Sequence, residues 1–286
     1  MAHPVYQYQP LATETSIRIL VLHPADRFAA QLEVCFKHLD RHAPYDLDIS
    51  GHYEAVSYCW GDPNFSHSVR FSSPTSQLPI TVNVDSMLRH LRKPHKAKHL
   101  WVDALCVNQT NAEEKSSQVR SMGGIFQAAT KVDVWLGPDA SCGVEKVFAY
   151  FKKLVNKHEY QESGVPSVLL NHFVTTDLTF REALEQLLSN PWFRRRWILQ
   201  EITVSLVSPG SPGIRKATSI RIVKKPLHTL HLCRNTAAMA KAVTAVFADS
   251  SIERVCDGAI ATSLLVAVKA YTVTVLLDQA TVSLAR

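Results

Sequence analysis

The sequence lacks the short motifs that mark common nucleotide-binding and hydrolytic sites. It contains no GxGxxG, no P-loop and no GxSxG pattern. Its six cysteines include no CxxC pair, and the histidines near them complete no zinc pattern. We therefore expect reduced, buried thiols, no metal site and no bound cofactor.

Membrane and secretion signals are also missing. The first eleven residues, MAHPVYQYQPL, have no basic start and no apolar core, so no signal peptide is predicted. The apolar stretch 259–268 is interrupted by Lys269, too early for a membrane span. The expected location is cytoplasmic, without a stable membrane span.

The net charge of +6 is unevenly distributed. Residues 204–286 hold ten Lys/Arg against four Asp/Glu, whereas residues 1–203 hold 21 of each sign. A neutral front part is a poor candidate for wrapping nucleic acid. The partners expected are therefore proteins rather than nucleic acids.

The stretch 99–139 is the most ordered pattern of the sequence. Two short apolar runs, Leu100–Leu105 and Val132–Leu136, flank a segment whose apolar residues recur at helical spacing. This pattern predicts strand, helix and strand, with the two strands as parallel neighbours. Polar residues 103–109 and 137–139 would then lie at the carboxyl edge of the sheet, where ligands bind in such folds.

Further elements follow from the same periodicities. Strands are predicted at Ile17–Leu22, around residues 32–36 and at Tyr53–Tyr58, the last ending in a Trp-Gly-Asp-Pro turn. Residues 64–76 are predicted as a loop, and Asn83 as the N-cap of a helix that ends before Pro94. The predicted fold is α/β, a mostly parallel sheet flanked by helices on both faces.

Three blocks resemble the fungal heterokaryon-incompatibility (HET) domain. They are YEAVSYCWGDP at Tyr53–Pro63, WVDALCVNQ at Trp101–Gln109 and NPWFRRRWILQEI at Asn190–Ile202. Their order and approximate spacing are similar to those of the family. The resemblance covers roughly residues 1–203 and predicts a HET-like α/β domain there.

The resemblance implies a function that composition and periodicity do not reveal. HET domains act in self/non-self recognition (allorecognition) in filamentous fungi, an innate-immunity-like response that ends in programmed cell death. One mechanism is regulated self-association, or binding to a regulatory receptor-type protein. The other is enzymatic, because HET domains are distantly similar to Toll/interleukin-receptor (TIR) domains, many of which cleave the nicotinamide bond of NAD. NAD would then be a substrate.

Several residues in these blocks are candidates for the site. The TIR-like spacing of Trp197 and Glu201 suggests catalysis by Glu201, although four-residue spacing on a helix equally suits a packed tryptophan with a solvated acid. Asp103 is a second candidate acid, or else a structural cap. The ligand-binding candidates are Ser57, Trp60, Gly61, Gln109 and Trp197. For the Trp60–Gly61 pair, the alternatives are a stacking platform and an anchored turn.

The segment 204–286 is predicted to be a separate, basic tail that is poorly ordered or loosely helical. It begins near a Ser-Pro-Gly-Ser-Pro-Gly linker and contains only two aromatic residues, Phe247 and Tyr271. Few large side chains are therefore available to offset the entropy cost of ordering. Isolated helices are expected around residues 236–248 and 259–268.

Overall fold

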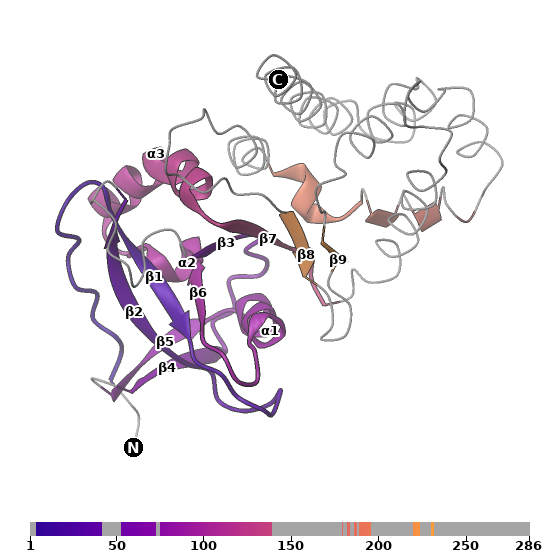
Figure 1. Ribbon diagram of the computed structural model, residues 1–286, viewed down its shortest axis with the longest axis horizontal. Helices are drawn as coiled ribbons and strands as arrows, with labels where there is room; N and C mark the ends of the chain where they lie inside the picture. Colours follow the sequence, from indigo (N-terminus) through magenta and orange to yellow (C-terminus); the bar gives the residue numbers. More distant parts are fainter. Residues whose placement is uncertain are drawn as a thin grey trace, which may run out of the picture. The chain divides into compact units, whose positions relative to one another are not determined.

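The computed structural model describes residues 4–41, 53–72, 75–138, 179, 182–183, 186–187, 189–195, 220–223 and 230–231. The chain divides into two compact units, one of residues 1–138 and 208–231, the other of residues 139–207 and 232–286. The described strands belong to the first unit and form one sheet in the order β5-β4-β2-β1-β6-β3-β7-β8-β9 (Figure 1).

The strands are β1 Ser16–Leu22, β2 Glu33–Asp40, β3 Glu54–Tyr58, β4 His67–Ser72, β5 Thr75–Ile80, β6 Lys98–Trp101, β7 Lys131–Trp135, β8 Ile220–Val223 and β9 Leu230–His231. The helices of this unit are α1 Val82–Leu91, α2 Asp103–Cys106 and α3 Ala112–Ala128. The strands predicted at 17–22, 32–36 and 53–58 are confirmed as β1, β2 and β3.

The sheet is mixed rather than mostly parallel, which corrects the sequence-based prediction. Parallel pairs join β2 to β4, β6 and β7 to β3, and β8 to β7. Antiparallel pairs join β1 to β2, β1 to β6, β4 to β5 and β8 to β9. The prediction extrapolated from the strand–helix–strand unit, whereas the short connections elsewhere favour antiparallel hairpins.

The central strand–helix–strand unit exists, with two differences from the prediction. Strands β6 and β7 are parallel but not neighbours, because β3 lies between them. The first strand ends at Trp101, and Asp103 begins helix α2. Leu105 and Cys106 of α2 are as buried as a core strand. From a short apolar run alone, a buried strand cannot be distinguished from a buried helical turn.

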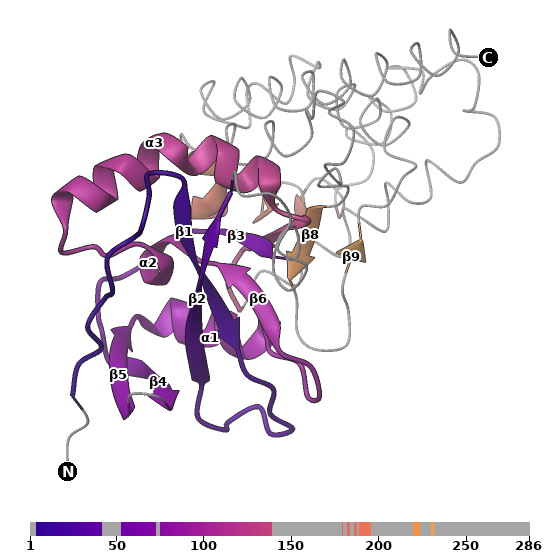
Figure 2. The same cartoon turned by 60° about the vertical axis from the view of Figure 1, so that its left-hand side comes forward.

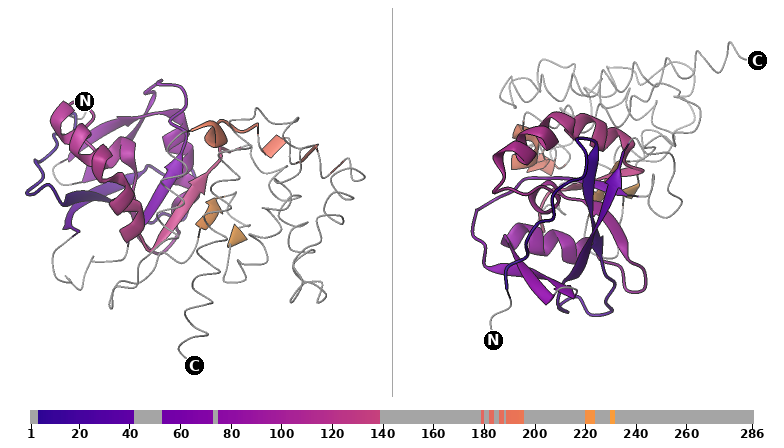
Figure 3. Two further views of the ribbon diagram at one scale, coloured as in Figure 1. Left: turned by 90° about the horizontal axis from the view of Figure 1, so that it is seen from above. Right: turned by 90° about the vertical axis from the view of Figure 1, so that its left-hand side faces the viewer.

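Helices cover both faces of the sheet, as predicted (Figures 2 and 3). On one face, Phe126 of α3 packs edge-on against Trp101 of β6, and Tyr53 donates a hydrogen bond to the carbonyl of Ile125. On the other face, Trp135 of β7 packs against His90 of α1. These buried aromatic contacts fix the helices relative to the strand ends.

Two local predictions around α1 are wrong. The N-cap of α1 is Thr81, whose side-chain oxygen accepts a hydrogen bond from the Val84 N–H, so Asn83 lies inside the helix. The segment 64–76, predicted as a loop, contains β4 and the start of β5. These strands are half-exposed and rich in serine, so they lack a clear apolar pattern.

In the second unit, Asn190 and Pro191 begin a helical turn, as predicted. The Asn190 side chain accepts a hydrogen bond from the Trp192 N–H at the start of the 3₁₀ helix Pro191–Arg194. The helices expected around 236–248 and 259–268 lie outside the described residues. Two strands within the predicted tail, β8 and β9, extend the sheet next to β7.

Candidate functional site

Three parallel strands end at one edge of the sheet. β3 ends at Tyr58, β6 at Trp101 and β7 at Trp135, and both β6 and β7 pair with β3 in parallel register. The segments that leave these strands therefore emerge side by side, at the edge where α/β sheets bind ligands. Two of the three HET-like blocks, 53–63 and 101–109, end there.

Trp60 and Asp103 meet at this edge. The Trp60 indole nitrogen donates a 2.8 Å hydrogen bond to Asp103 Oδ2, and the Ala104 N–H donates a 2.7 Å bond to Asp103 Oδ1. Asp103 is the first residue of α2, and its negative charge interacts favourably with the dipole at the N-terminus of the helix. The Trp60 side chain remains 44% exposed. The indole is held at its nitrogen while its ring remains accessible.

Gln109 contacts the backbone of Asp103. Its side-chain amide nitrogen donates a 2.9 Å hydrogen bond to the backbone carbonyl of Asp103, which folds the loop after α2 back onto that helix. The structure therefore brings Asp103, Gln109 and Trp60 together, with Gly61 next to Trp60 in the chain. Ser57 is buried inside β3, opposite Val134 of β7.

Gly61 allows the turn after Trp60. Its φ of +74° lies in the left-handed region that favours glycine. An added Cβ would lie 3.6 Å from the Cβ of Asn83, so the turn approaches the start of α1 closely. The conformation of the turn is therefore determined both by glycine and by contact with the helix.

Asn83 is a site residue that sequence reasoning missed. Its amide nitrogen donates a 2.5 Å hydrogen bond to the Cys59 carbonyl, and its Oδ1 accepts a 2.9 Å bond from the Trp135 indole nitrogen. Asn83 thereby connects the ends of β3 and β7. An asparagine near a helix start reads as a cap in sequence, and only the tertiary structure reveals these two partners.

A buried ion pair connects β1 to α2 and α3. Arg18 of β1 is fully buried and donates hydrogen bonds to both carboxylate oxygens of Glu114, at 2.5 and 3.0 Å, and to the Cys106 carbonyl. Glu114 also accepts the Asn108 N–H. Burial alone would raise the pKa of Glu114, but the bonds from Arg18 and Asn108 lower it below the ordinary value.

A second charged cluster lies at the opposite ends of the same strands. Lys98 pairs with Glu54 and Asp133, and Lys131 pairs with the same two carboxylates. Burial alone would raise the pKa of Glu54, but the two lysines and a hydrogen bond with Asp133 lower it well below the ordinary value. Asp133, which interrupts an apolar run in the sequence, is fully buried, and Lys98 and Lys131 balance its charge.

The described residues offer no group of three or more His, Cys, Asp or Glu side chains arranged to hold a metal ion. Burial raises the pKa of the Cys106 thiol to about 12, so this cysteine is neutral at physiological pH. No helix among the described residues is long and apolar enough to cross a membrane.

Comparison with known protein families identifies the family of this chain. The sequence profile described as Heterokaryon incompatibility protein (HET) matches residues 53–201, slightly more than half of the chain. The chain belongs to the HET family. The match begins at the residue before β3 and covers the edge formed by Trp60, Asp103 and Gln109.

A named relative agrees with this assignment. The HET-family chain is 30% identical over 231 residues to Heterokaryon incompatibility protein 6, OR allele, of Neurospora crassa. The alignment covers 65% of this chain and 32% of the relative, so the chain spans about a third of that protein. No solved structure matches the chain.

Trp197 and Glu201 lie within the matched segment but outside the described residues. The catalytic role of Glu201 and the ligand-binding role of Trp197 therefore stay predictions.

Proposed function

We propose that this HET-family chain acts in heterokaryon incompatibility, triggering programmed cell death through regulated self-association. Family membership and the relative's name support the biological role. The exposed, oriented Trp60 indole carries the proposal that the chain acts by binding another protein. Tryptophan is enriched among the residues that dominate binding energy at protein interfaces, and a side chain already held in place loses little entropy on binding.

A killing assay tests this role. The full chain is expressed in a filamentous fungus under an inducible promoter, and colony survival is compared among variants expressed at equal levels. Trp60→Ala is expected to abolish killing because the exposed ring is lost. Val5→Ala, a truncation at another exposed apolar residue, is the matched control and should kill like wild type. Full killing by a well-folded Trp60→Ala variant would contradict the proposal.

Trp60→Phe separates the two properties of the indole. Phenylalanine keeps an aromatic ring but cannot donate the hydrogen bond to Asp103. If orientation of the ring matters, this variant should kill less efficiently than wild type and more efficiently than Trp60→Ala. Equal killing by Trp60→Phe and wild type would assign the effect to apolar surface alone.

A second candidate function is NAD cleavage. The observation that favours it is the carboxylate of Asp103 beside an exposed aromatic ring at the carboxyl edge of parallel strands. In this reaction water adds to the ribose carbon as nicotinamide leaves with the bonding electrons, and a carboxylate stabilises the developing positive charge. Glu201 is the proposed catalytic group.

Incubation of the purified full chain with NAD, with nicotinamide release followed by chromatography, tests the second candidate. Release that disappears in Glu201→Gln and persists in Val5→Ala would support it. Full killing by a well-folded Glu201→Gln variant would exclude the enzymatic mechanism, whereas killing that requires Trp60 but not Glu201 favours self-association.

A further inference from the structure

Two exposed patches of opposite charge lie at the two ends of helix α1. We name them the acidic patch and the basic patch. The acidic patch consists of Trp60, Asp62, Phe65 and Asp103. The basic patch consists of Arg27, Phe28, Lys93 and Lys96.

The acidic patch belongs to the N-terminal end of α1. Its turn is attached there by the hydrogen bond from Asn83 to the Cys59 carbonyl and by the contact of Gly61 with Asn83. Residues 60–66 form an uninterrupted exposed stretch, in which Trp60 and Phe65 are the large apolar side chains. Asp62 in this stretch is exposed, and Asp103, which is half-exposed and accepts the hydrogen bond from Trp60, adds a second acidic side chain.

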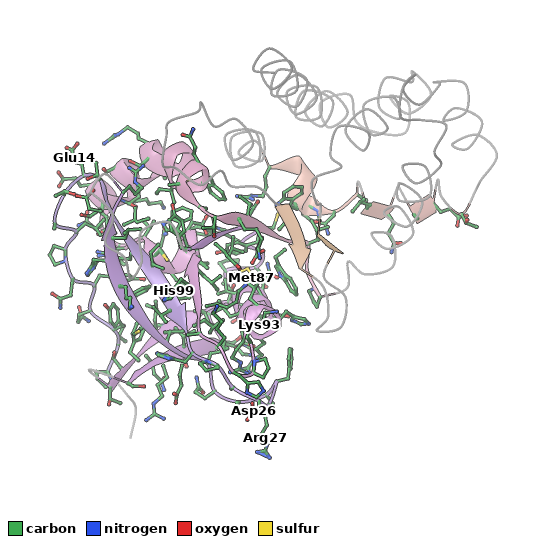
Figure 4. All side chains as sticks on the ribbon, in the orientation of Figure 1. Glu14, Asp26, Arg27, Met87, Lys93 and His99 are labelled. Atoms are coloured by element: carbon green, nitrogen blue, oxygen red, sulfur yellow. The ribbon has the colours of Figure 1, made fainter. Side chains whose placement is uncertain are left out.

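The basic patch belongs to the C-terminal end of α1. Arg92, which follows the helix, donates hydrogen bonds to the carbonyls of Arg27 and Phe28, and the Ala25 N–H donates to the Lys93 carbonyl. These bonds hold the loop after β1 against the segment that precedes β6. In Figure 4, Asp26 and Arg27 lie at one end of β1 and Glu14 at the other.

The side chains of the basic patch complement those of the acidic patch. Arg27, Lys93 and Lys96 are exposed, and Asp26, which contacts His95, is the acid among them. Phe28 is an exposed aromatic residue, held edge-on by the His90 ring. Each end of α1 therefore presents an aromatic side chain beside a net charge, and the two net charges have opposite signs.

We propose that the acidic patch of one copy of this chain binds the basic patch of a second copy. This proposal rests on the proposed function, because it specifies the surface through which self-association occurs. Aromatic residues from both copies would form the buried centre, with the charges as a rim that sets orientation. The two patches are separated by the length of α1, about 15 Å for ten residues.

The arrangement of the patches determines the form of the assembly. A contact between two different surfaces is heterologous, so every bound copy still presents one free patch of each kind. The contacts therefore continue into a ring or an open filament rather than stopping at a dimer. A signal that depends on assembly would then rise steeply with the concentration of the chain.

Substitutions that reverse the charges of the two patches test the proposal. The full chain and its variants are examined by sedimentation velocity over a concentration series. Asp62→Lys makes the acidic patch less negative, and Lys93→Glu combined with Lys96→Glu reverses most of the basic patch. Each variant alone is expected to associate at least tenfold more weakly than wild type, because like charges then face each other.

An equimolar mixture of the two variants should associate again. In the mixture, the lysine introduced at position 62 faces the glutamates introduced at positions 93 and 96, and the unchanged patches face each other. An interface that pairs identical patches would instead leave one of the two variants associating like the wild type when alone, because the patch it uses is unchanged in that variant. Trp60→Ala should weaken association about 30-fold, as expected for a central anchor residue, while Arg120→Met, at an exposed position on α3, should leave it unchanged.

Two results would overturn the proposal and are distinguishable. If the wild type associates and the charge variants associate equally well, another surface mediates assembly, and the proposed self-association stands without this interface. If the wild type and all variants stay monomeric at every concentration, both this interface and self-association as the mechanism are refuted. Circular dichroism of each variant verifies that its fold is retained.

Discussion

Replacement of Arg18 by methionine should destabilise the first unit strongly. The Arg18 side chain is fully buried and forms hydrogen bonds with Glu114, the Cys106 carbonyl and the Gln9 carbonyl. It also lies 5.0 Å from the centre of the Tyr8 ring. Methionine fills much of the volume but supplies no donor, so the Glu114 carboxylate loses its countercharge.

The expected loss is about 3 kcal/mol in the free energy of unfolding. Breaking a buried ion pair by removing one partner typically costs about 3–5 kcal/mol. The lower end applies here because the Glu114 side chain keeps 10% exposure and the hydrogen bond from the Asn108 N–H. Since domains of this kind are stable by about 5–15 kcal/mol, the variant should still fold.

Urea denaturation followed by tryptophan fluorescence measures this loss, and a double-mutant cycle with Glu114→Gln isolates the pair. We expect a coupling energy of about 1–3 kcal/mol between the two substitutions. Arg120→Met removes an exposed arginine and is the matched control, with an expected change within about 0.5 kcal/mol. A loss below 0.5 kcal/mol for Arg18→Met would refute the reasoning.

The pH dependence gives an independent check of the same pair. The folded pKa of Glu114 is lowered, so its contribution to stability is fully present above the unfolded value of about 4.3 and is lost as the pH falls. The wild type should therefore lose stability below about pH 5 more steeply than Arg18→Met. Parallel curves for both proteins would show that the ion pair does not lower this pKa.

Three further predictions concern other parts of the chain. Lys98→Met should reduce the free energy of unfolding by about 3 kcal/mol, because the buried Asp133 loses its closer lysine. The pKa of Glu54 is also lowered in the fold, so the thermal stability of the wild type, measured at pH 3–7, should fall with acidification below about pH 5. A flat stability profile over this pH range would contradict the prediction. Gly61→Ala should cost about 1 kcal/mol in urea denaturation, from backbone strain at φ +74° rather than from a clash, and a neutral effect would argue against that turn. Limited proteolysis should begin near residues 208–216, in the Ser-Pro-Gly segment that precedes β8, whereas resistance to cleavage there would contradict the predicted linker.

The sequence by itself determined the family and the main elements of the first unit. Clear apolar periodicity predicted β1, β3, α3 and β7, because a buried strand or an amphipathic helix must repeat its apolar residues at a fixed spacing. The sequence also predicted that polar residues 103–109 lie at the carboxyl edge of the sheet, directly after a strand. The contact of Trp60 with Asp103 agrees with that expectation.

Only the tertiary structure decided the strand order and the partners of single polar side chains. Periodicity contains no information about which strands pair, so β3 between β6 and β7, and the antiparallel β1 beside β6, were not predicted. The same holds for Asn83, whose two partners lie 24 and 52 residues away in sequence. Such hydrogen bonds depend on distance in space, and local sequence patterns record only the neighbours along the chain.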